Sequence, residues 1–280
     1  MRPPSLPLLL LALLAGACAG GGAQAEVRPF VPIPEPVARR APPSSAPPSA
    51  AAPSAAAASV PIPRPRPYAA ALVAGQSVEG REIPVHVRGL GPDICLLLAT
   101  IHGNEPAGTP ILERLLAHLD DHPELLRGRR VIVMPVANPD GLAARTRANA
   151  NGIDLNRNFE APNRRDGGRY GEEALSEPEA AAVRAVVRQF RPSRVLSIHQ
   201  PLRCVDWDGP ARMLARDLAA VTDLPLKKLG TRPGSMGAWA EAGSLPLVTL
   251  ELPPRVESLG ADELWRRYGE AMLVFVRARP

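Results

Sequence analysis

The sequence contains little cysteine. Of its three cysteines, Cys18 lies in the apolar N-terminal region, which leaves Cys95 and Cys204 to form one disulfide at most. A scaffold built on disulfides is therefore excluded. We expect Cys95 and Cys204 to be buried free thiols, although the sequence alone leaves a pairing between them open.

Most of the chain also lacks an excess of charge of one sign. The whole chain carries a net charge of +5, but residues 1–67 hold six arginines against two glutamates and account for +4 of it. The remaining residues have a net charge of +1 and indicate no basic stripe. A nucleic-acid partner is therefore not expected.

The N-terminal residues are typical of an export signal. Arg2 is followed by an apolar run over residues 6–14, which is too short to span a bilayer, and then by small residues up to position 22. Residues 1–25 are predicted to be a signal peptide or a lipoprotein signal. Cys18 resembles a lipid acceptor, but Ala15 stands where a large aliphatic residue is usual, so a lipid anchor and simple secretion stay equally open. The expected location is the periplasm or cell envelope.

Residues 26–67 are predicted to be a disordered spacer. They consist mainly of proline, alanine and serine, and residues 1–67 together contain 16 of the 34 prolines. Such a segment buries too little apolar surface to offset the entropy lost on ordering. A proline-stiffened spacer of this length reaches on the order of 100 Å. Residues 68–280 are then the predicted catalytic domain.

Within residues 68–280, short apolar runs rich in β-branched residues alternate with helical patterns. Strands are predicted over residues 82–87, 94–100, 131–136, 194–198 and 245–250, and helices over 106–126, 176–190, 211–221 and 261–277. Ser176 and Glu179 match a capping box. Apolar strands between helices indicate an α/β fold with a mixed, mostly parallel central sheet and helices on both faces. Ligands of such sheets bind beyond the carboxyl ends of the strands.

Two histidines and a glutamate follow predicted strands at that edge. His102 and Glu105 are three residues apart in the turn after one strand, and His199 ends another. Taken alone, each of these residues is more often an ordinary polar residue than a metal ligand. Together they complete a three-ligand zinc set with one open position, the arrangement of a catalytic site. His86, His118 and His122 are predicted to be structural.

A carboxylate ends a further strand. Glu251 follows Val248-Thr249-Leu250, and a carboxylate in that place is costly to bury unless it is paired or used. Beside a hydrolytic zinc site, Glu251 has the chemistry of a general base, which takes a proton from the attacking water and returns it to the leaving amine.

A polar segment lies between these elements. Residues 151–159 contain Asn156 and Arg157, and a guanidinium can hold a carboxylate in a two-pronged contact. Residues 138–141, Asn-Pro-Asp-Gly, are a turn signal.

Together these segments resemble the zinc carboxypeptidase family (M14), whose pieces they match in order over most of residues 75–255. The resemblance implies peptide or amide hydrolysis, one zinc ion on His102, Glu105 and His199, and Glu251 as the base. It further implies that Asn156 and Arg157 bind the substrate carboxylate. Asp154 is implied to orient a zinc histidine, and Arg147, with Arg145 as a competitor, to stabilise the oxyanion.

Within the family, residues 200–206 and 233–254 look most like the bacterial murein peptide amidases, which cut the γ-D-glutamyl–diaminopimelate bond. We hypothesise that Asp206 faces the extra amino group of diaminopimelate. One departure from the digestive members is that residues 226–233 contain no tyrosine, which Thr231 or Arg232 replaces only in part. The alternatives are a general metallocarboxypeptidase, an aspartoacylase-like deacylase and a non-catalytic protein that binds wall peptides.

Overall fold

The computed structural model describes residues 68–279, so the predicted signal, the spacer and Cys18 lie outside the described residues. The strands are β1 (Ala69–Gln76), β2 (Glu82–Arg88), β3 (Asp93–Ala99), β4 (Arg129–Met134), β5 (Arg194–His199), β6 (Cys204–Asp208) and β7 (Leu247–Glu251). The helices are α1 (Gly108–Asp121), α2 (Pro139–Ala144), α3 (Pro178–Phe190), α4 (Arg212–Ala220), α5 (Met236–Ala242) and α6 (Ala261–Arg277).

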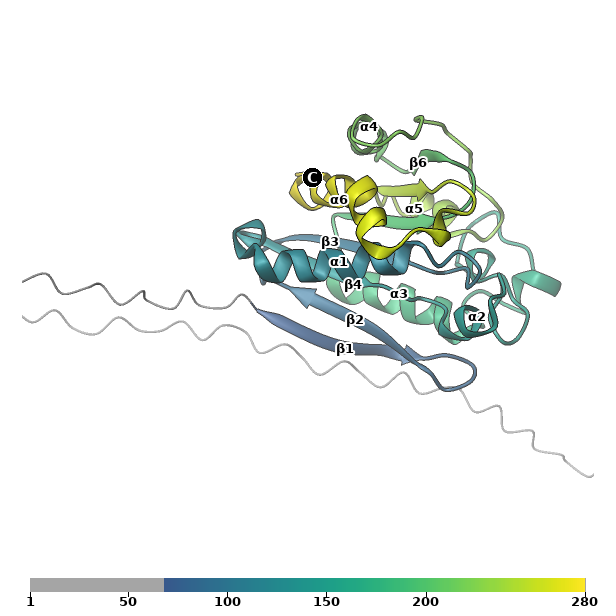
Figure 1. Ribbon diagram of the computed structural model, residues 1–280. Helices are drawn as coiled ribbons and strands as arrows, with labels where there is room; N and C mark the ends of the chain where they lie inside the picture. Colours follow the sequence, from purple (N-terminus) through teal and green to yellow (C-terminus); the bar gives the residue numbers. More distant parts are fainter. Residues whose placement is uncertain (1–67, 280) are drawn as a thin grey trace, which may run out of the picture.

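All seven strands form one sheet in the order β1-β2-β4-β3-β5-β7-β6 (Figure 1). The four central strands, β4, β3, β5 and β7, run parallel to one another. The outer pairings, β1 with β2, β2 with β4 and β6 with β7, are antiparallel. The predicted mixed sheet with a parallel centre is confirmed.

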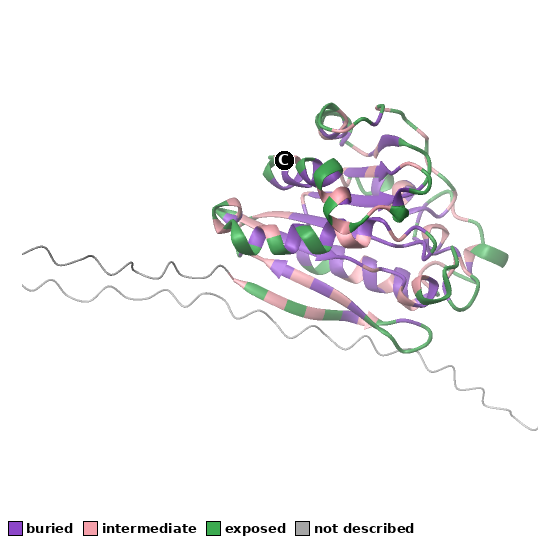
Figure 2. Ribbon diagram, viewed as in Figure 1, coloured by how far each residue is buried: buried purple, intermediate pink, exposed green. Residues whose placement is uncertain are grey.

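The sheet separates two apolar cores, because successive side chains of a strand point to opposite faces. Cys95 and Leu97 of β3 lie in the core beneath α1, α4 and α6, whereas Leu96 and Leu98 lie in the core beneath α3 and α5. The central strands are buried along most of their length (Figure 2). Helices therefore cover both faces, as predicted.

The two described cysteines are free and buried, as expected. Cys95 is on β3 and Cys204 on β6, three strand positions apart in the sheet. At ~4.8 Å per strand spacing they lie too far apart to be bridged.

Several boundaries differ from the predictions. The helix expected over residues 106–126 ends at Asp121 and is followed by a separate 3₁₀ turn (Pro123–Leu126), because Pro123 has no N–H to continue it. The capping box at Ser176 is wrong: α3 begins at Pro178, and no side chain caps it. β1 was not predicted; it pairs with β2 and forms one edge of the sheet. β6, α2 and α5 were not predicted either.

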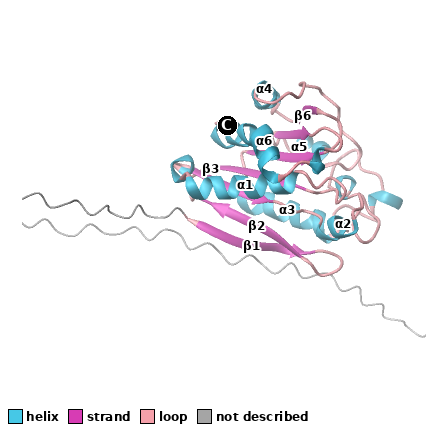
Figure 3. Cartoon of the chain, viewed as in Figure 1, coloured by secondary structure: helices cyan, strands magenta, loops and turns pink. Residues whose placement is uncertain are grey.

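The loop between β1 and β2 contacts the Asn-Pro-Asp-Gly segment at residues 138–141. The carboxylate of Asp140, in the first turn of α2, accepts hydrogen bonds from the Ser77 hydroxyl at 2.7 Å, the Glu79 amide N–H at 2.9 Å and Arg81 at 2.6 Å. The loop between β1 and β2 is thereby fastened to α2. Long loops gather at the end of the sheet where β3, β5 and β7 finish (Figure 3). Across residues 68–279 we find no helix with the length and apolarity to cross a bilayer.

Candidate active site

Three neighbouring parallel strands deliver the predicted residues to one edge. β3 ends at Ala99, three residues before His102, while His199 and Glu251 are the last residues of β5 and β7. The register pairs Ala99 with Ile198, and His199 with Glu251. Sheet pairing alone therefore brings the two histidine segments and the carboxylate together.

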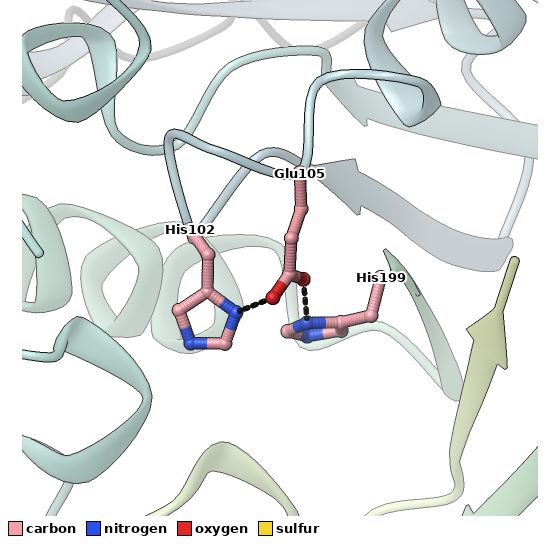
Figure 4. A group of neighbouring side chains, drawn as sticks. All are labelled: His102, Glu105 and His199. Carbon is pink, nitrogen blue, oxygen red and sulfur yellow. Dashed lines mark hydrogen bonds and ion pairs between the residues drawn. The ribbon is translucent and has the colours of Figure 1, made fainter. Parts of the chain in front are cut away.

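His102, Glu105 and His199 form a compact buried cluster. Their ligand atoms all lie within 4.8 Å of one another, and His102 is 2% exposed. Glu105 lies between the two rings: its Oε1 is 3.0 Å from Nδ1 of His102, and its Oε2 is 2.9 Å from Nδ1 of His199 (Figure 4). Among the described residues, no other group of three such side chains is close enough to hold a metal.

The cluster fits a zinc ion. Nδ1 of His102 is buried and lies close to Glu105, but it makes no hydrogen bond of acceptable geometry. This nitrogen is therefore available to coordinate a metal ion. Nε2 of the same ring is 3.0 Å from Oδ1 of Asp154, which fixes the ring and leaves Nδ1 for the metal. Two imidazoles and one carboxylate are a typical catalytic zinc set with an open position.

The charge of Glu105 suits this role. Burial alone raises the pKa of Glu105, but the adjacent imidazole rings of His102 and His199 outweigh burial and hold that pKa far below its ordinary value. The carboxylate therefore stays ionised, as a metal ligand must.

Arg147, and not Arg145, lies at the cluster. Its Nε donates to Oδ2 of Asp154 at 2.9 Å and its Nη1 to Oε1 of Glu105 at 3.0 Å, while the side chain remains 45% exposed. Arg145 ends α2 in the left-handed conformation, with φ of 55°, and is exposed. Arg147, the arginine assigned by the resemblance, lies at the cluster, whereas its competitor Arg145 does not.

Glu251 lies beside the cluster at the end of β7. It is buried, and its Oε2 accepts a hydrogen bond from the backbone N–H of Leu202 at 3.3 Å. Burial raises the pKa of Glu251 above its ordinary value, and nearby His199 acts in the opposite direction. A carboxylate with a raised pKa is a stronger base, so its environment suits proton transfer.

Asn156 and Arg157 occupy the 3₁₀ turn that follows Asp154 (Leu155–Arg157). The side-chain oxygen of Asn156 accepts the N–H of Met236 at 2.8 Å, which joins this turn to the start of α5. Nε of Arg157 is buried without a hydrogen-bond partner. Burial lowers the pKa of Arg157, with Asp154 opposing the shift. An anionic ligand would relieve this buried charge.

Asp206 is buried on β6. Its Oδ1 accepts the backbone N–H of Leu229 at 2.9 Å, and burial raises its pKa. The register pairs Asp206 with Thr249, and Thr249 with Ser197. These three residues form a row across three strands, which we call the polar row. Ser197 and Thr249 lie two residues before His199 and Glu251 and so on the same face of the sheet, and Asp206 shares that face as the cross-strand partner of Thr249.

The sequence reasoning missed Ser197 and Thr249. Ser197 is 2% exposed, and its hydroxyl makes no hydrogen bond to any described residue. The alternation of side chains along a strand could have identified them, because each hydroxyl residue lies two positions before a predicted site residue and so on the same face. A buried hydroxyl without a partner is costly, so the polar row is a surface suited to a polar ligand.

This fold and site define a metal-dependent hydrolase. Residues 66–203 match the family model for zinc carboxypeptidases. Murein peptide amidase A of Escherichia coli K12 is 35% identical over 203 residues, which cover 66% of this chain and 80% of that protein. Murein peptide amidase A of Vibrio campbellii is 32% identical, over 66% of this chain and 78% of that protein.

The solved structures agree. Murein-tripeptide amidase from Escherichia coli O157 matches with a TM-score of 0.58 and 31% identity, over 75% of this chain and 92% of that one. Carboxypeptidase A from Helicoverpa armigera matches with a TM-score of 0.64 over 75% of this chain and 68% of that one, and at 19% identity it shows the fold alone. The chain belongs to the zinc carboxypeptidase family. It is a zinc-dependent enzyme that hydrolyses peptide amide bonds.

Proposed function

We propose that this protein is an exported murein peptide amidase, which hydrolyses the γ-D-glutamyl–diaminopimelate bond of cell-wall peptides. The two relatives named above, each over 66% of this chain, bear the murein peptide amidase name. The signal-like residues at the N-terminus agree with a wall substrate.

The polar row is the observation that carries this substrate. A carboxypeptidase for apolar C-terminal residues needs an apolar pocket, whereas Ser197, Thr249 and Asp206 present hydroxyls and a carboxylate. Within residues 68–279 no lysine or arginine forms an ion pair with Asp206. The nearby Lys228 pairs instead with Asp208, at 2.6 Å. A buried carboxylate without a cationic partner is suited to the ammonium group of diaminopimelate.

The side chains divide the chemistry between them. His102, Glu105 and His199 would hold a zinc ion, which when bound would supply the Lewis acid for the scissile carbonyl and for the attacking water. Glu251 accepts the proton of the attacking water and delivers it to the leaving amine. Arg147 uses Nε and Nη1 on Asp154 and Glu105, which leaves its Nη2 for the negative charge that develops on the carbonyl oxygen.

Asn156 and Arg157 bind the carboxylate on the leaving side of the bond. Nδ2 of Asn156 is available because the fold uses only its oxygen, and Arg157 supplies a half-buried guanidinium. This pair positions the C-terminal carboxylate of the substrate, and Asp206 binds the ammonium group on the diaminopimelate side chain.

Two peptides separate this proposal from a general carboxypeptidase. The protein is incubated with L-Ala-γ-D-Glu-diaminopimelate and with an ordinary L-tripeptide, and the products are identified by mass spectrometry. We expect release of diaminopimelate and little cleavage of the L-tripeptide. The reverse preference would make the protein a general carboxypeptidase. If the purified protein binds no zinc and cleaves neither peptide, the binding-protein alternative is favoured.

A matched pair of variants tests Asp206. Asp206→Asn removes the charge from the polar row, whereas Asp208→Asn removes a charge that already pairs with Lys228. We expect only Asp206→Asn to weaken the preference for the diaminopimelate peptide over a peptide ending in 2-aminopimelate, which lacks only the distal amino group. If Asp206→Asn keeps the wild-type preference for the diaminopimelate peptide, Asp206 does not contact the substrate.

Location is tested separately. Fractionation of cells is expected to find the mature protein in the periplasm or envelope, and a cytoplasmic full-length chain would contradict export. Labelling with a fatty-acid analogue, with Cys18→Ser as control, decides between the lipid anchor and simple secretion.

A further inference from the structure

A tight turn separates Arg147 from Asp154, the two residues that flank the zinc cluster. Within it, the backbone N–H of Asn149 donates to the carbonyl of Ile153 at 3.0 Å, and Gly152 N–H donates to the carbonyl of Asn149 at 3.0 Å. The side-chain oxygen of Asn149 accepts the N–H groups of Asn151 and Ile153, at 3.2 and 3.1 Å. Asn149 therefore sets the shape of the turn through its backbone and its side chain.

The amide of Asn149 is fastened from behind. Its Nδ2 donates to Oε2 of Glu177 at 2.7 Å and to Oε2 of Glu179 at 2.9 Å, at the start of α3. Asn149, Glu177 and Glu179 are all buried. We call these three residues the asparagine clamp.

The clamp holds two carboxylates without a cation. Within residues 68–279, neither Glu177 nor Glu179 forms an ion pair with lysine or arginine. Their partners are neutral: Asn149, Asn151 at 2.9 Å, the hydroxyl of Ser176 at 2.9 Å, and the N–H of Val78 at 3.1 Å. Burial raises the pKa of Glu179, which Asn149 partly offsets. Placing two acids here is costly, and a purely structural turn does not require them.

The turn's shape fixes the distance between Arg147 and Asp154. Arg147 lies two residues before Asn149, and Asp154 directly follows Ile153, whose N–H and carbonyl both bind Asn149. Across this turn the guanidinium of Arg147 meets the carboxylate of Asp154 at 2.9 Å. A change in the turn would therefore move the guanidinium relative to the zinc cluster.

We propose that Asn149, held by Glu177 and Glu179, is a positioning residue that acts on the reaction through Arg147. It does not touch the substrate. The inference rests on the proposed function in so far as Arg147 stabilises charge in the transition state.

A double-mutant cycle tests this inference on the full protein. The variants are Arg147→Ala, Asn149→Ala and the double variant. Arg147→Ala is expected to lower kcat by ~100-fold or more. Asn149→Ala is expected to lower kcat by roughly 10- to 100-fold, with KM changed by less than about 3-fold and zinc content retained. Because Asn149 acts through Arg147, the double variant is expected to be no slower than Arg147→Ala by more than about 3-fold.

A structural role alone predicts a different pattern. The two losses would multiply in the double variant, and that result overturns the inference, as does loss of zinc or a change confined to KM. Ser193→Ala is the control. It deletes two hydrogen bonds at the opposite end of β5, one to the Ile94 carbonyl and one from Arg194, so any loss it causes should multiply with that of Arg147→Ala. If Asn149→Ala does not fold, Asn149→Ser takes its place in the cycle, since its hydroxyl still reaches the turn.

The cycle is kept separate from the proposed function. It is run on whichever peptide the wild-type protein cleaves, so an ordinary L-peptide serves if the diaminopimelate peptide is not a substrate. Failure of the murein substrate is then seen in the wild type, and failure of the clamp is seen in the variants.

Discussion

Replacing Gly103 with alanine should disrupt the zinc site without touching a ligand. A Cβ at Gly103 would lie 1.8 Å from the carbonyl carbon of Gly141 and 2.2 Å from its oxygen. Non-bonded carbon atoms keep ~3.5 Å apart, so the metal loop and α2 would have to separate by on the order of 1.5 Å. α2 has little room to withdraw, because a Cβ at Gly141 would lie 2.6 Å from the carbonyl oxygen of Ala148.

The consequence falls on His102 and Glu105, which flank Gly103 within the same loop. Active sites tolerate displacements of about 0.5 Å. We therefore expect zinc affinity to fall by roughly 10- to 100-fold, as when a ligand's support is lost, and kcat/KM by ~100-fold or more.

The assay is zinc content by mass spectrometry, zinc affinity by competition with a chelator, and turnover of the cleaved peptide. Gly75→Ala is the control, because its Cβ would meet only Ala182 at an ordinary 3.5 Å. Folded Gly103→Ala protein that keeps one zinc per chain and wild-type turnover would refute the packing argument.

Four further predictions follow from single contacts. Glu251→Gln should keep zinc and lose ~100- to 10,000-fold in kcat, because it removes the base and leaves the ligands; equal turnover would exclude Glu251 as the base. Asp154→Asn should weaken zinc binding by roughly 10- to 100-fold, because His102 loses the carboxylate at its Nε2, and unchanged affinity in the chelator competition would contradict this. Arg157→Lys should raise KM more than it lowers kcat, because an ammonium cannot make the two-pronged carboxylate contact; a loss confined to kcat would argue against binding. Since burial raises the pKa of Asp206, KM for the diaminopimelate peptide should rise as the pH falls toward a pKa above 3.8, and Asp206→Asn should lack this acid limb in its pH profile.

Much of the site was predictable because strand ends carry it. Apolar strands that lead into His102, His199 and Glu251 bring these residues together only if those strands are parallel neighbours, and the alternation of strands with helices made that arrangement the expected one. The spacing of His102 and Glu105 then supplied the third ligand.

The missed features depend on contacts distant in sequence. Glu179 matches a local capping box with Ser176, yet it binds Asn149 and the N–H of Val78, which no local pattern reveals. Arg145 remained a competitor of Arg147 in the sequence, because the left-handed conformation at the end of α2, which separates their positions, has no local signal there. β1 was missed because its alanines and exposed side chains lack the apolar alternation of a strand.

Anomalous diffraction at the zinc edge from crystals of the protein tests the central claim most directly. We expect one strong peak bounded by Nδ1 of His102, Nδ1 of His199 and the carboxylate of Glu105, with zinc–ligand distances of ~2.0–2.2 Å. Zinc held by other side chains, or no zinc at these three residues in protein that still hydrolyses its peptide, would contradict the account.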